Sequence, residues 1–513
     1  HSLSVPRKEN HFLSLQNKRL RISAYARKLK RASLKSELNM NLAAHLKKRG
    51  PIKKVGVIGM GYVGIPSAIL FADVYPHVYG FQRDSRSSGY KVAMLNRGES
   101  PLKGEEPGLE GMLKKVINKG TFSCTTDFSK IAKLDAVTIA IQTPFRNPKD
   151  LTPDFSALFE GIRMAGRYIE EGTLVVLEST ITPGTTAGIA REILQEESGM
   201  TPGTDFALAH APERVMVGRL IRNIREHDRI VGGINPESTR RAQELYNPLL
   251  TKGRIIPMTA TAAEVTKTAE NTFRDLQIAA VNELALYCEA MGINVYDVRE
   301  GIASLKEEGV TRAILWPGAG VGGHCLTKDT YHLERGVKTI GKDYLDYPKG
   351  KESLFTLARS INDFMPVHMA YLTEEGLKRA GKGVQGSRIA ILGWAFIANS
   401  DDARNTPSEI YRDLMEEKRA FVSIHDPFVE GKEIEKDLAK ALIGADVVAI
   451  FTSHTKYQFL DPEVTGVKKP FPVIIDGRNI IDPDMFISSG WIYKGIGRGD
   501  KNNHPICFPL NRT

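Results

Sequence analysis

Short apolar runs separated by amphipathic segments dominate the pattern of the chain after residue 50. In the first half, four of these runs have the length and composition of buried strands, and the segments between them have helical periodicity. Strands that alternate with helices predict a parallel, doubly wound sheet. The runs are KKVGVIG (53–59), HVYGF (77–81), DAVTIAI (135–141) and TLVVLES (173–179).

A second set of strand-like runs follows a helical middle. One of them, ADVVAIFT, is similar to DAVTIAIQT of the first half, which indicates two nucleotide-type folds. The predicted fold class is therefore α/β, with two Rossmann-like doubly wound domains joined by a helical middle domain that contains one long central helix. The runs are SRIAILG (387–393), FVSIHDP (421–427), ADVVAIFT (445–452) and PVIIDGRN (472–479).

The long helix is predicted from a stretch without glycine or proline between Met258 and Met291. At 1.5 Å per residue it would be roughly 50 Å long. One face is expected to be buried because apolar residues recur along it at helical spacing. These residues are Val265, Ala269, Leu276, Ala280 and Leu284.

A different face of this helix carries polar and cationic side chains. Lys267, Asn271 and Arg274 are spaced i, i+4 and i+7, so they lie on one side. Such a stripe is usually solvated surface, but it can also line a catalytic site. Spacing alone leaves both interpretations open.

Composition excludes several classes of protein. The four cysteines lie far apart without a CxxC pair, which argues against a disulfide scaffold or a metal site and favours the cytoplasm. No apolar run approaches the about 20 residues of a spanning helix, so no integral membrane contact is expected.

The net charge of +10 comes from one segment. Residues 1–50 carry 13 Lys or Arg against Glu9 and Glu37, and the remaining 57 basic and 58 acidic residues nearly cancel. A basic, Ser-containing segment could be a transit peptide, an arm for nucleic acid or a membrane surface, or a solvated helix. We favour the solvated helix and expect no specific nucleic-acid partner.

A glycine-rich turn, GMGYVG (59–64), separates the first predicted strand from a helix pattern. In this context the first glycine makes a tight turn, the second admits a pyrophosphate, and the third lets helix and strand pack closely. The turn therefore predicts a dinucleotide site with contacts at Gly59, Gly61, Tyr62, Val63 and Gly64.

Polar residues at the ends of two later strands belong to the same prediction. Ligands bind outside the carboxyl ends of parallel strands, where Thr143, Pro144, Glu178 and Thr180 lie. We expect contacts with cofactor or substrate there, with ordinary turn chemistry as the alternative.

The segment WPGAGVGGHCLTKDTY (316–331) carries the most distinctive candidate chemistry. Cys325 follows a run of glycines and precedes Lys328 and Asp329, so a thiol here can approach a bound ligand. A neighbouring cation or base increases the thiolate fraction and makes such a thiol a nucleophile. The alternative is a tight turn with a buried, inert cysteine.

Taken in order, these motifs resemble those of the nucleotide-sugar 6-dehydrogenases, which oxidise UDP-hexoses to UDP-hexuronic acids. The resemblance covers residues 53 to about 500, and GGHC and APER are similar to the UDP-N-acetylhexosamine branch. It is carried by GMGYVGIPSA, ESTITPGTT, APERVMVGR, KTAENTFRD, PGAGVGGHCLTKD, ARSINDFMP, GWAFIANSDDARNTP, DPF and DGRNI.

The resemblance implies an architecture and partners. A basic extension (1–50) would precede an NAD-binding Rossmann domain (51–255), a helical domain that dimerises (256–380) and a UDP-binding Rossmann-like domain (381–513). The expected cofactor is NAD, the substrate a UDP-sugar and the assembly a homodimer.

The resemblance also implies roles for individual residues. Cys325 would trap an aldehyde as a thiohemiacetal, and Lys267 with Asn271 would stabilise oxyanions. Asp329 would be the general base, and Glu178 would help to orient water. Substrate contacts are expected at Glu213, Arg214, Arg312, Gly322, Gly323 and Arg478.

Two positions depart from the family pattern. Ile397 stands where the family usually has a lysine that contacts the diphosphate. At the end of the second strand Gln82 and Arg83 replace the expected acid, with Asp84 behind them. We therefore predict contacts of Gln82 and Arg83 with the cofactor, and NAD as the preferred cofactor with tolerance of NADP.

Other activities remain as alternatives at this stage. A UDP-glucose 6-dehydrogenase would share every motif above except those of the branch. A 3-hydroxyacid or 6-phosphogluconate type dehydrogenase would need neither Cys325 nor a second αβ domain. A non-catalytic scaffold with a basic binding arm would not need Cys325, Lys267 and Asp329 together.

Overall fold

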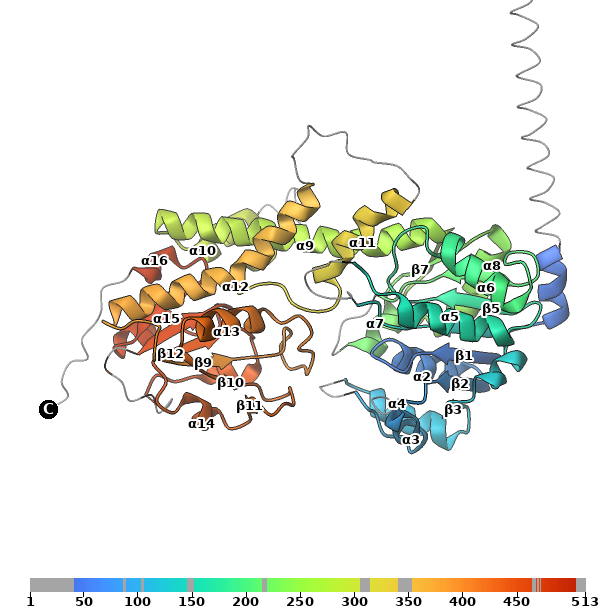
Figure 1. Cartoon of the computed structure of the whole chain (residues 1–513), viewed down its shortest axis with the longest axis horizontal. Coiled ribbons are helices and arrows are strands. Elements are labelled where there is room, and N and C mark those ends of the chain that lie inside the picture. The colour runs from blue at the N-terminus through green and yellow to red at the C-terminus, as the bar shows by residue number, and fades with distance from the viewer. Residues whose placement is uncertain are drawn as a thin grey trace, which may run out of the picture.

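The computed structural model of the 513-residue chain describes residues 41–503, with gaps at 86–88, 103–105, 145–151, 215–218, 305–313, 340–352, 464–466, 468–469 and 471. Two sheet domains are connected by long helices that run between them (Figure 1).

The N-terminal domain is built on a sheet with the strand order β3-β2-β1-β4-β5-β6-β7-β8. Neighbouring strands are parallel except β6 and β7, which are antiparallel. The four strands predicted in this half are β1, β2, β4 and β5. The strands are β1 (Lys54–Ile58), β2 (His77–Phe81), β3 (Phe122–Thr125), β4 (Ala136–Ile139), β5 (Leu174–Leu177), β6 (Ala207–His210), β7 (Arg229–Gly233) and β8 (Ile255–Thr259).

Helices cover both faces of this sheet (Figure 1). Helix α2 follows the glycine-rich turn and is almost entirely buried, as expected of the first helix of a doubly wound sheet. The helices of the domain are α2 (Gly64–Val74), α3 (Tyr90–Asn96), α4 (Leu109–Asn118), α5 (Ser156–Tyr168), α6 (Arg191–Ser198), α7 (Leu220–Glu226) and α8 (Pro236–Tyr246), with short turns η1 (Phe128–Lys133), η2 (Thr186–Ala190) and η3 (Asn247–Leu249).

The end of the basic extension is packed against this domain. Residues 41–49 form a helix, and Leu42 and Leu46 are buried in the core of the N-terminal domain. Arg49 donates to the carbonyl oxygen of Leu134 at 2.6 Å and pairs with Glu170 at 3.0 Å. The solvated helix is expected from the basic stretch at residues 15–35, which lies with the rest of residues 1–40 outside the described part of the chain, so it stays a prediction.

The predicted long helix is α9 (Ala260–Met291), which spans the distance between the two sheet domains (Figure 1). The Thr259 hydroxyl caps its first turn, and Gly292 ends it in the left-handed conformation (φ 70°). The other helices of the middle are α10 (Val295–Ala303), α11 (Leu326–Thr339) and α12 (Leu354–Arg379).

The face of α9 that is buried differs from the one predicted. Val265 and Ala280 of the expected apolar stripe are exposed, and Ala269, Leu276 and Leu284 are only partly buried. Half of the buried residues are instead polar, and several of them have partners on α12 or in the N-terminal domain. The polar ones are Glu264, Lys267, Thr268, Thr272, Asp275 and Asn282.

Helices α9 and α12 are joined by a buried polar network. Asp275 accepts from Arg359 at 2.5 Å and from Asn362 at 2.8 Å. Asn282 binds Asn362 at 2.8 Å and accepts from the backbone N–H of Gly318 at 2.9 Å. Through Gly318, this network anchors the start of the segment that carries Cys325.

The C-terminal domain is a smaller parallel sheet with the order β11-β10-β9-β12-β13-β14, which confirms the second Rossmann-like fold. The strands are β9 (Arg388–Leu392), β10 (Phe421–His425), β11 (Ile434–Glu435), β12 (Val447–Ile450), β13 (Val473–Asp476) and β14 (Ile492–Gly495). The helices are α13 (Pro407–Glu417), α14 (Leu438–Leu442), α15 (Pro483–Ser488) and α16 (Gly499–Asn502), with the turn η5 (Thr455–Phe459).

Candidate active site

The glycine-rich turn has the shape that a dinucleotide requires. A Cβ atom on Gly64 would lie 1.8 Å from the carbonyl oxygen of Gly59, so only glycine allows this close approach of turn and helix. Around Gly61, in contrast, no atom lies within 4 Å of such a Cβ, which leaves the backbone open to a ligand. Tyr62 and Val63 lie between these glycines, directly before α2. The residues present therefore fit a bound pyrophosphate.

Two side chains, one directly after β2 and one on α3, bind the backbone of this turn. Gln82 Oε1 accepts from the N–H of Met60 at 3.2 Å, and Lys91 Nζ donates to the carbonyl oxygen of the same residue at 3.0 Å. Lys91 is half-buried, and desolvation lowers the pKa of its ammonium group. Arg83 and Asp84 are exposed. Gln82 thus stands where the family usually has an acid, and Lys91 binds the same residue of the turn as Gln82 does.

The strand ends contribute Thr143, which is buried, and the more accessible Pro144 and Thr180. Thr143 donates from its hydroxyl to the carbonyl oxygen of Thr180 at 2.8 Å, so the ends of β4 and β5 are tied together. The same hydroxyl lies 3.4 Å from Lys328 Nζ on α11. The predicted cofactor end of the sheet is therefore in direct contact with the segment that carries Cys325.

The glycines before Cys325 let this segment pack closely against the C-terminal part of the chain. Gly320 (φ 125°) and Gly323 (φ 92°) have left-handed conformations. A Cβ on Gly322 would lie 2.6 Å from Phe396, and one on Gly323 would lie 2.7 Å from the ring of the same residue. The backbone thus has no space for side chains here, as predicted from the glycine run.

Cys325 lies directly before α11, and its side chain is exposed to solvent. Its carbonyl oxygen accepts from the N–H groups of Lys328 and Asp329, so the residue begins the helix. The two other described cysteines, Cys124 and Cys288, are buried. Within the described residues, Cys325 is therefore the thiol that a ligand can reach.

Two residues predicted to be catalytic, Asn271 and Asp329, are in contact with each other, and Lys328 joins them. Asn271 on α9 donates to Asp329 Oδ2 at 2.5 Å, and Lys328 Nζ donates to Asp329 Oδ1 at 2.9 Å. Lys328 also contacts His332 Nε2 at 3.3 Å, and this lysine and Asp329 are almost completely buried. The carboxylate is thus held from both sides by α9 and α11.

The charges around the thiol oppose one another. Desolvation and the negative charge of Asp329 raise the pKa of the Cys325 thiol, while the positive charges of Lys267, Lys328 and Arg404 lower it, and the net direction is upward. Lys267 is buried on the same side of α9 as Asn271, whereas Arg274 is exposed. Burial lowers the pKa of His324, the neighbour of the thiol, to about 3, so this imidazole is neutral.

Glu178, Glu213 and Arg214 form a separate cluster around Arg229. Arg229 pairs with Glu178 at 3.2 Å and with Glu213 at 2.5 Å, and Glu178 also accepts from the Tyr246 hydroxyl at 2.6 Å. Burial raises the pKa of Glu178 to about 7, against the effect of Arg229. The predicted water-orienting acid therefore already has two protein partners.

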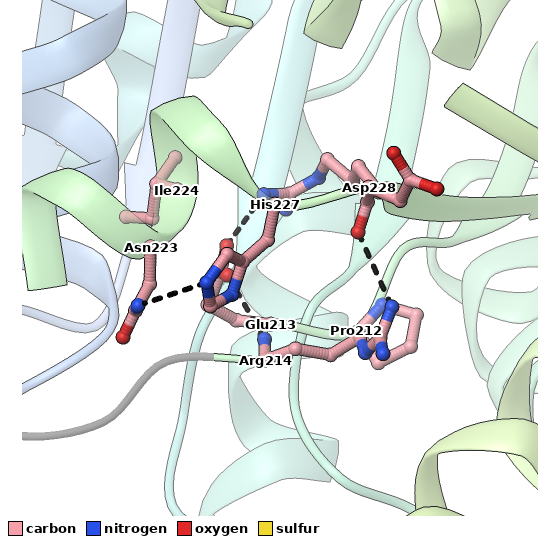
Figure 2. Close-up of a pocket in the computed structure, with 8 residues that line it drawn as sticks. Pro212, Glu213, Arg214, Asn223, Ile224, His227 and Asp228 are labelled. Atoms are coloured by element: carbon pink, nitrogen blue, oxygen red, sulfur yellow. Dashed lines mark hydrogen bonds and ion pairs between the residues drawn. The ribbon is translucent and has the colours of Figure 1, made fainter. Parts of the chain in front are cut away.

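A small cavity of about 10 Å³ opens beside this cluster (Figure 2). Arg214 reaches across it to the carbonyl oxygen of Asp228 at 3.2 Å and pairs with Glu270 at 2.7 Å. His227 faces Asn223 at 3.3 Å on the other side (Figure 2). This volume suits at most one water molecule, so the predicted substrate contacts of Glu213 and Arg214 would lie outside the cavity.

In the C-terminal domain, Arg478 faces the start of the glycine run. Its Nε donates to the carbonyl oxygen of Phe451 at 2.6 Å, and its Nη1 would lie 2.7 Å from a Cβ on Gly318. Ile397, which replaces the family lysine, is half-buried. Arg312 lies outside the described residues.

Residues 53–250, 261–362 and 390–483 match the NAD binding domain, the central domain and the UDP binding domain of the UDP-glucose/GDP-mannose dehydrogenase family. UDP-N-acetyl-D-mannosamine dehydrogenase of Pyrococcus horikoshii is 37% identical over 448 residues, which are 87% of this chain and 100% of that protein.

The chain belongs to the UDP-glucose/GDP-mannose dehydrogenase family. It is accordingly an NAD-dependent oxidoreductase of the UDP-sugar dehydrogenase type. This excludes the hydroxyacid dehydrogenase alternative and the scaffold without catalytic activity.

Solved structures of this family have the same fold. NDP-N-acetyl-D-galactosaminuronic acid dehydrogenase from Methanosarcina mazei Go1 is 65% identical, with a TM-score of 0.81 over 91% of this chain and 99% of that one. A UDP-glucose dehydrogenase from Pyrobaculum islandicum is 26% identical, with a TM-score of 0.72 over 87% and 98% of the two chains. Among the described residues of this family member, no helix has the length and apolar character needed to span a bilayer.

Lys328, Arg404 and Asn405 contact the Cys325 segment or residues beside it, although the sequence predicts no role for them. Lys328 was noted beside Cys325 but was assigned no role, although it contacts Asp329, His332 and Thr143. Asn405 donates to the carbonyl oxygen of Gly323 at 3.1 Å, and Arg404 accepts from the Gly323 N–H at 2.8 Å through its own carbonyl. The sequence DDARN (401–405) is rich in polar residues, which marks it as a candidate contact segment. Its pairing with Gly323, some 80 residues earlier in the chain, could not be inferred from that pattern.

The cofactor end of the site predicts a measurable selectivity. Gln82→Asp is expected to weaken NADPH binding by at least about tenfold while sparing NADH, because a carboxylate repels a 2′-phosphate and accepts from a 2′-hydroxyl. Dissociation constants from protein fluorescence would measure this. Lys119→Ala, at an exposed position before β3 and without a predicted cofactor contact, is the matched control and should change neither constant more than about twofold. A wild-type enzyme with a higher kcat/KM for NADP than for NAD would contradict the prediction.

The charges at the thiol predict a pH dependence. Because the pKa of Cys325 is raised, its thiolate fraction near neutral pH is lower than that of free cysteine, and its alkylation rate should keep rising with pH beyond the midpoint of free cysteine. Asp329→Asn removes a charge that raises the pKa and should lower this midpoint, while Lys267→Met should raise it. Iodoacetamide modification of the Cys325 peptide, followed by mass spectrometry from about pH 6 to 10, measures both shifts. Midpoints that do not move would mean that neither charge acts on the thiol.

Proposed function

We propose that the protein oxidises C6 of a UDP-N-acetylhexosamine to the carboxylate, in a four-electron reaction with two equivalents of NAD. The observation that carries this proposal is an accessible thiol, Cys325, beside the Asn271–Asp329–Lys328 cluster, in a segment that touches both the NAD-binding sheet and the C-terminal domain. The names of the relatives from Pyrococcus horikoshii and Methanosarcina mazei Go1 support the N-acetylhexosamine class.

The bound dinucleotide would accept one hydride in each half of the reaction. Gly59, Gly61 and Gly64 would hold its pyrophosphate, with Thr143 and Thr180 at the reacting end of the sheet. In the first half, the C6 alcohol loses a hydride and a proton and becomes an aldehyde. Asp329 is the general base that takes up the proton, directly or through water.

In the second half, the Cys325 thiolate adds to the aldehyde carbon and forms a thiohemiacetal. Loss of a second hydride and of the hydroxyl proton from this adduct leaves a thioester. Water then attacks the thioester carbon and the C–S bond breaks, which releases the carboxylate and returns the thiol. The covalent bond keeps the intermediate from escaping between the two oxidations.

Lys267 and Asn271 would stabilise the negative oxygen that develops in each step. The ammonium group of Lys267 is buried and acts on the thiol electrostatically, so it lies in a region where its charge is weakly screened. Asn271 is already oriented by its hydrogen bond to Asp329. Glu178 would help to orient water through its second oxygen, since Arg229 and Tyr246 both bind Oε1 and Oε2 has no hydrogen-bond partner among the described residues.

The UDP group is assigned to the C-terminal domain. Arg478 sits beside Gly318 at the carboxyl end of β13, where parallel sheets bind ligands, and its guanidinium suits a diphosphate. Ile397 adds no charge there, so Arg478 carries more of the phosphate recognition than it would beside a lysine. Arg312, Gly322 and Gly323 complete the proposed substrate contacts, with Glu213 and Arg214 as more distant members.

The experiment that tests the proposal is a panel of UDP-sugars. The N-acetylated gluco, galacto and manno epimers are compared with UDP-glucose, with NADH absorbance and product mass as readouts. An N-acetylhexosamine should be oxidised with two NADH per sugar. Oxidation of UDP-glucose alone would overturn the proposed substrate class, and the two relatives' names, which differ in epimer, make the manno and galacto arms the decisive ones.

Dimerisation through the helical middle belongs to the same proposal. On α9 the apolar residues Phe273, Tyr287 and Met291 are 62%, 61% and 59% exposed, and on α12 Leu357 and Tyr371 are 49% and 52% exposed. An apolar surface of this kind on two packed helices favours an interface with a second copy. Phe273→Glu should shift the molar mass measured by light scattering from that of a dimer to that of a monomer. If the variant stays a dimer, the interface lies on another surface.

The proposed chemistry also favours a reducing compartment. The reaction needs Cys325 as a free thiol, and the three described cysteines are all free. We therefore place the enzyme in the cytoplasm.

A further inference from the structure

The cofactor turn and the thiol segment are connected by residues 399–405 of the C-terminal domain. At one end, Tyr62 of the glycine-rich turn donates from its hydroxyl to Asp401 Oδ1 at 2.9 Å, and the guanidinium carbon of Arg404 lies 5.2 Å from the centre of the Tyr62 ring. Tyr62 is thus the residue through which the pyrophosphate-binding turn touches the C-terminal domain in these contacts. Burial and the hydrogen bond to Asp401 raise the pKa of its hydroxyl, which therefore keeps its proton.

At the other end, the same residues hold the backbone on both sides of Cys325. The Gly323 N–H donates to the Arg404 carbonyl at 2.8 Å, and Asn405 Nδ2 donates to the Gly323 carbonyl and to the Thr327 hydroxyl, both at 3.1 Å. Gly323 lies two residues before the thiol and Thr327 two residues after it. A displacement of residues 404–405 would therefore displace Cys325.

The connecting segment is held rigidly at its base. Asn399 (φ 54°) and Asn405 (φ 50°) both have left-handed conformations, which non-glycine residues adopt only when the surroundings impose them. The Asn399 N–H donates to His454 Nδ1 at 2.9 Å, and His454 Nε2 binds the buried Asp426 at 3.1 Å. A segment held in this way, in contact with Tyr62 of the cofactor turn and with Gly323 and Thr327 on either side of the thiol, can transmit a shift from one to the other.

We propose that the Tyr62–Asp401 hydrogen bond couples occupancy of the dinucleotide site to the position of Cys325, which makes Tyr62 and Asp401 positioning residues for the thiol. Such a link would serve the proposed chemistry, because the first NADH must leave and a second NAD must enter while the sugar carbon stays on the sulfur. The inference rests on the proposed role of Cys325.

The test measures the coupling without turnover. ADP-ribose fills the pyrophosphate and adenosine positions but lacks the nicotinamide that would shield the thiol directly. It should slow iodoacetamide modification of Cys325 by at least about fivefold in the wild type, the scale of a coupling free energy between two sites. In Tyr62→Phe and in Asp401→Asn, the slowing should fall below about twofold, because each substitution removes the connecting hydrogen bond or its charge.

The control is Tyr75→Phe. It removes a tyrosine hydroxyl of the same domain, which donates to the Leu245 carbonyl at 2.8 Å in the core, and it should keep the full ADP-ribose effect. If Tyr62→Phe fails to fold, Asp401→Asn still tests the coupling, because asparagine keeps the shape of the aspartate side chain.

Two results would overturn the coupling: no effect of ADP-ribose in the wild type, or the same slowing in the wild type and both variants. Neither result depends on the role of Cys325 in turnover. A wild-type yield of one NADH per sugar would instead overturn the proposed function, so the two failures are distinguishable.

Discussion

Cys325→Ala is expected to abolish formation of the uronate, with a loss of at least about 10³-fold in rate, because removal of the nucleophile from a covalent mechanism leaves no route to the thioester. The thiol is exposed and lies outside the glycine-rich turn, so its removal should not disturb the fold or NADH binding. The measurement is product mass together with the number of NADH formed per UDP-sugar, which should be two for the wild type.

The matched control for this variant is Cys288→Ala. Cys288 is buried on α9 and has no contact with the proposed chemistry, so this variant should lose stability and keep its two NADH per sugar. If Cys325→Ala made uronate at close to the wild-type rate, Cys325 would be a residue of a tight turn and another route would be needed.

Lys267→Ala is expected to reduce kcat by at least about 10²-fold, the usual effect of removing a preorganised partner of an oxyanion. The side chain is 7% exposed and its charge acts on the thiol, so water cannot readily replace it. Steady-state kinetics should show the loss in kcat, with a smaller change in KM for the UDP-sugar, because the ground-state alcohol carries no charge.

Arg274→Ala is the control from the same helix. Arg274 is seven residues beyond Lys267 and exposed, so its removal should change kcat less than about twofold. Equal and mild effects of the two substitutions would mean that the polar stripe of α9 is only a surface feature.

The helices and strands that can be predicted are those marked by a pattern within a short stretch of the sequence. The strands β1, β2, β4 and β5 and the helix α9 follow from apolar runs and from the absence of glycine and proline, and the caps Thr259 and Gly292 set the helix ends within two residues of the prediction. Strands β3 (FSCT) and β6 (ALAH) have few large apolar side chains, whereas the equally short β4 and β5 lie within the longer apolar runs DAVTIAI and TLVVLES.

The orientation of α9 was predicted incorrectly because periodicity identifies an apolar stripe but not its partner. The stripe with Val265 and Ala280 is exposed, while Asp275 and Asn282 are buried against Arg359 and Asn362 of α12. A buried polar face is stable only if every group finds a partner, and those partners lie about 80 residues away. No local pattern contains that information.

In the candidate site, too, short motifs identify residues, but they do not identify the residues' partners in the fold. Cys325, Asn271 and Asp329 were assigned from motifs, and the structure brings Asn271 into contact with Asp329 across 58 residues. The contacts of Lys328 and of residues 399–405 depend on how domains pack, so sequence alone could not give them. The predicted contact of Gln82 with the cofactor stays a prediction, and its Oε1 accepts from the N–H of Met60 in the glycine-rich turn.

The placement of α9 also determines the order in which the chain can fold on the ribosome. Glu264 in its first turns accepts from the N–H groups of Gly184 and Thr186, at 2.5 and 2.7 Å, and so completes the N-terminal domain. Ala285 and Cys288 near its other end belong to the hydrophobic core of the C-terminal domain. The N-terminal domain can therefore fold completely as soon as the start of α9 has left the ribosome. The apolar side chains at the other end of α9 have no partners until more than a hundred further residues have been synthesised. During that interval the nascent chain presents an unpaired apolar segment, which is where a chaperone would be expected to bind.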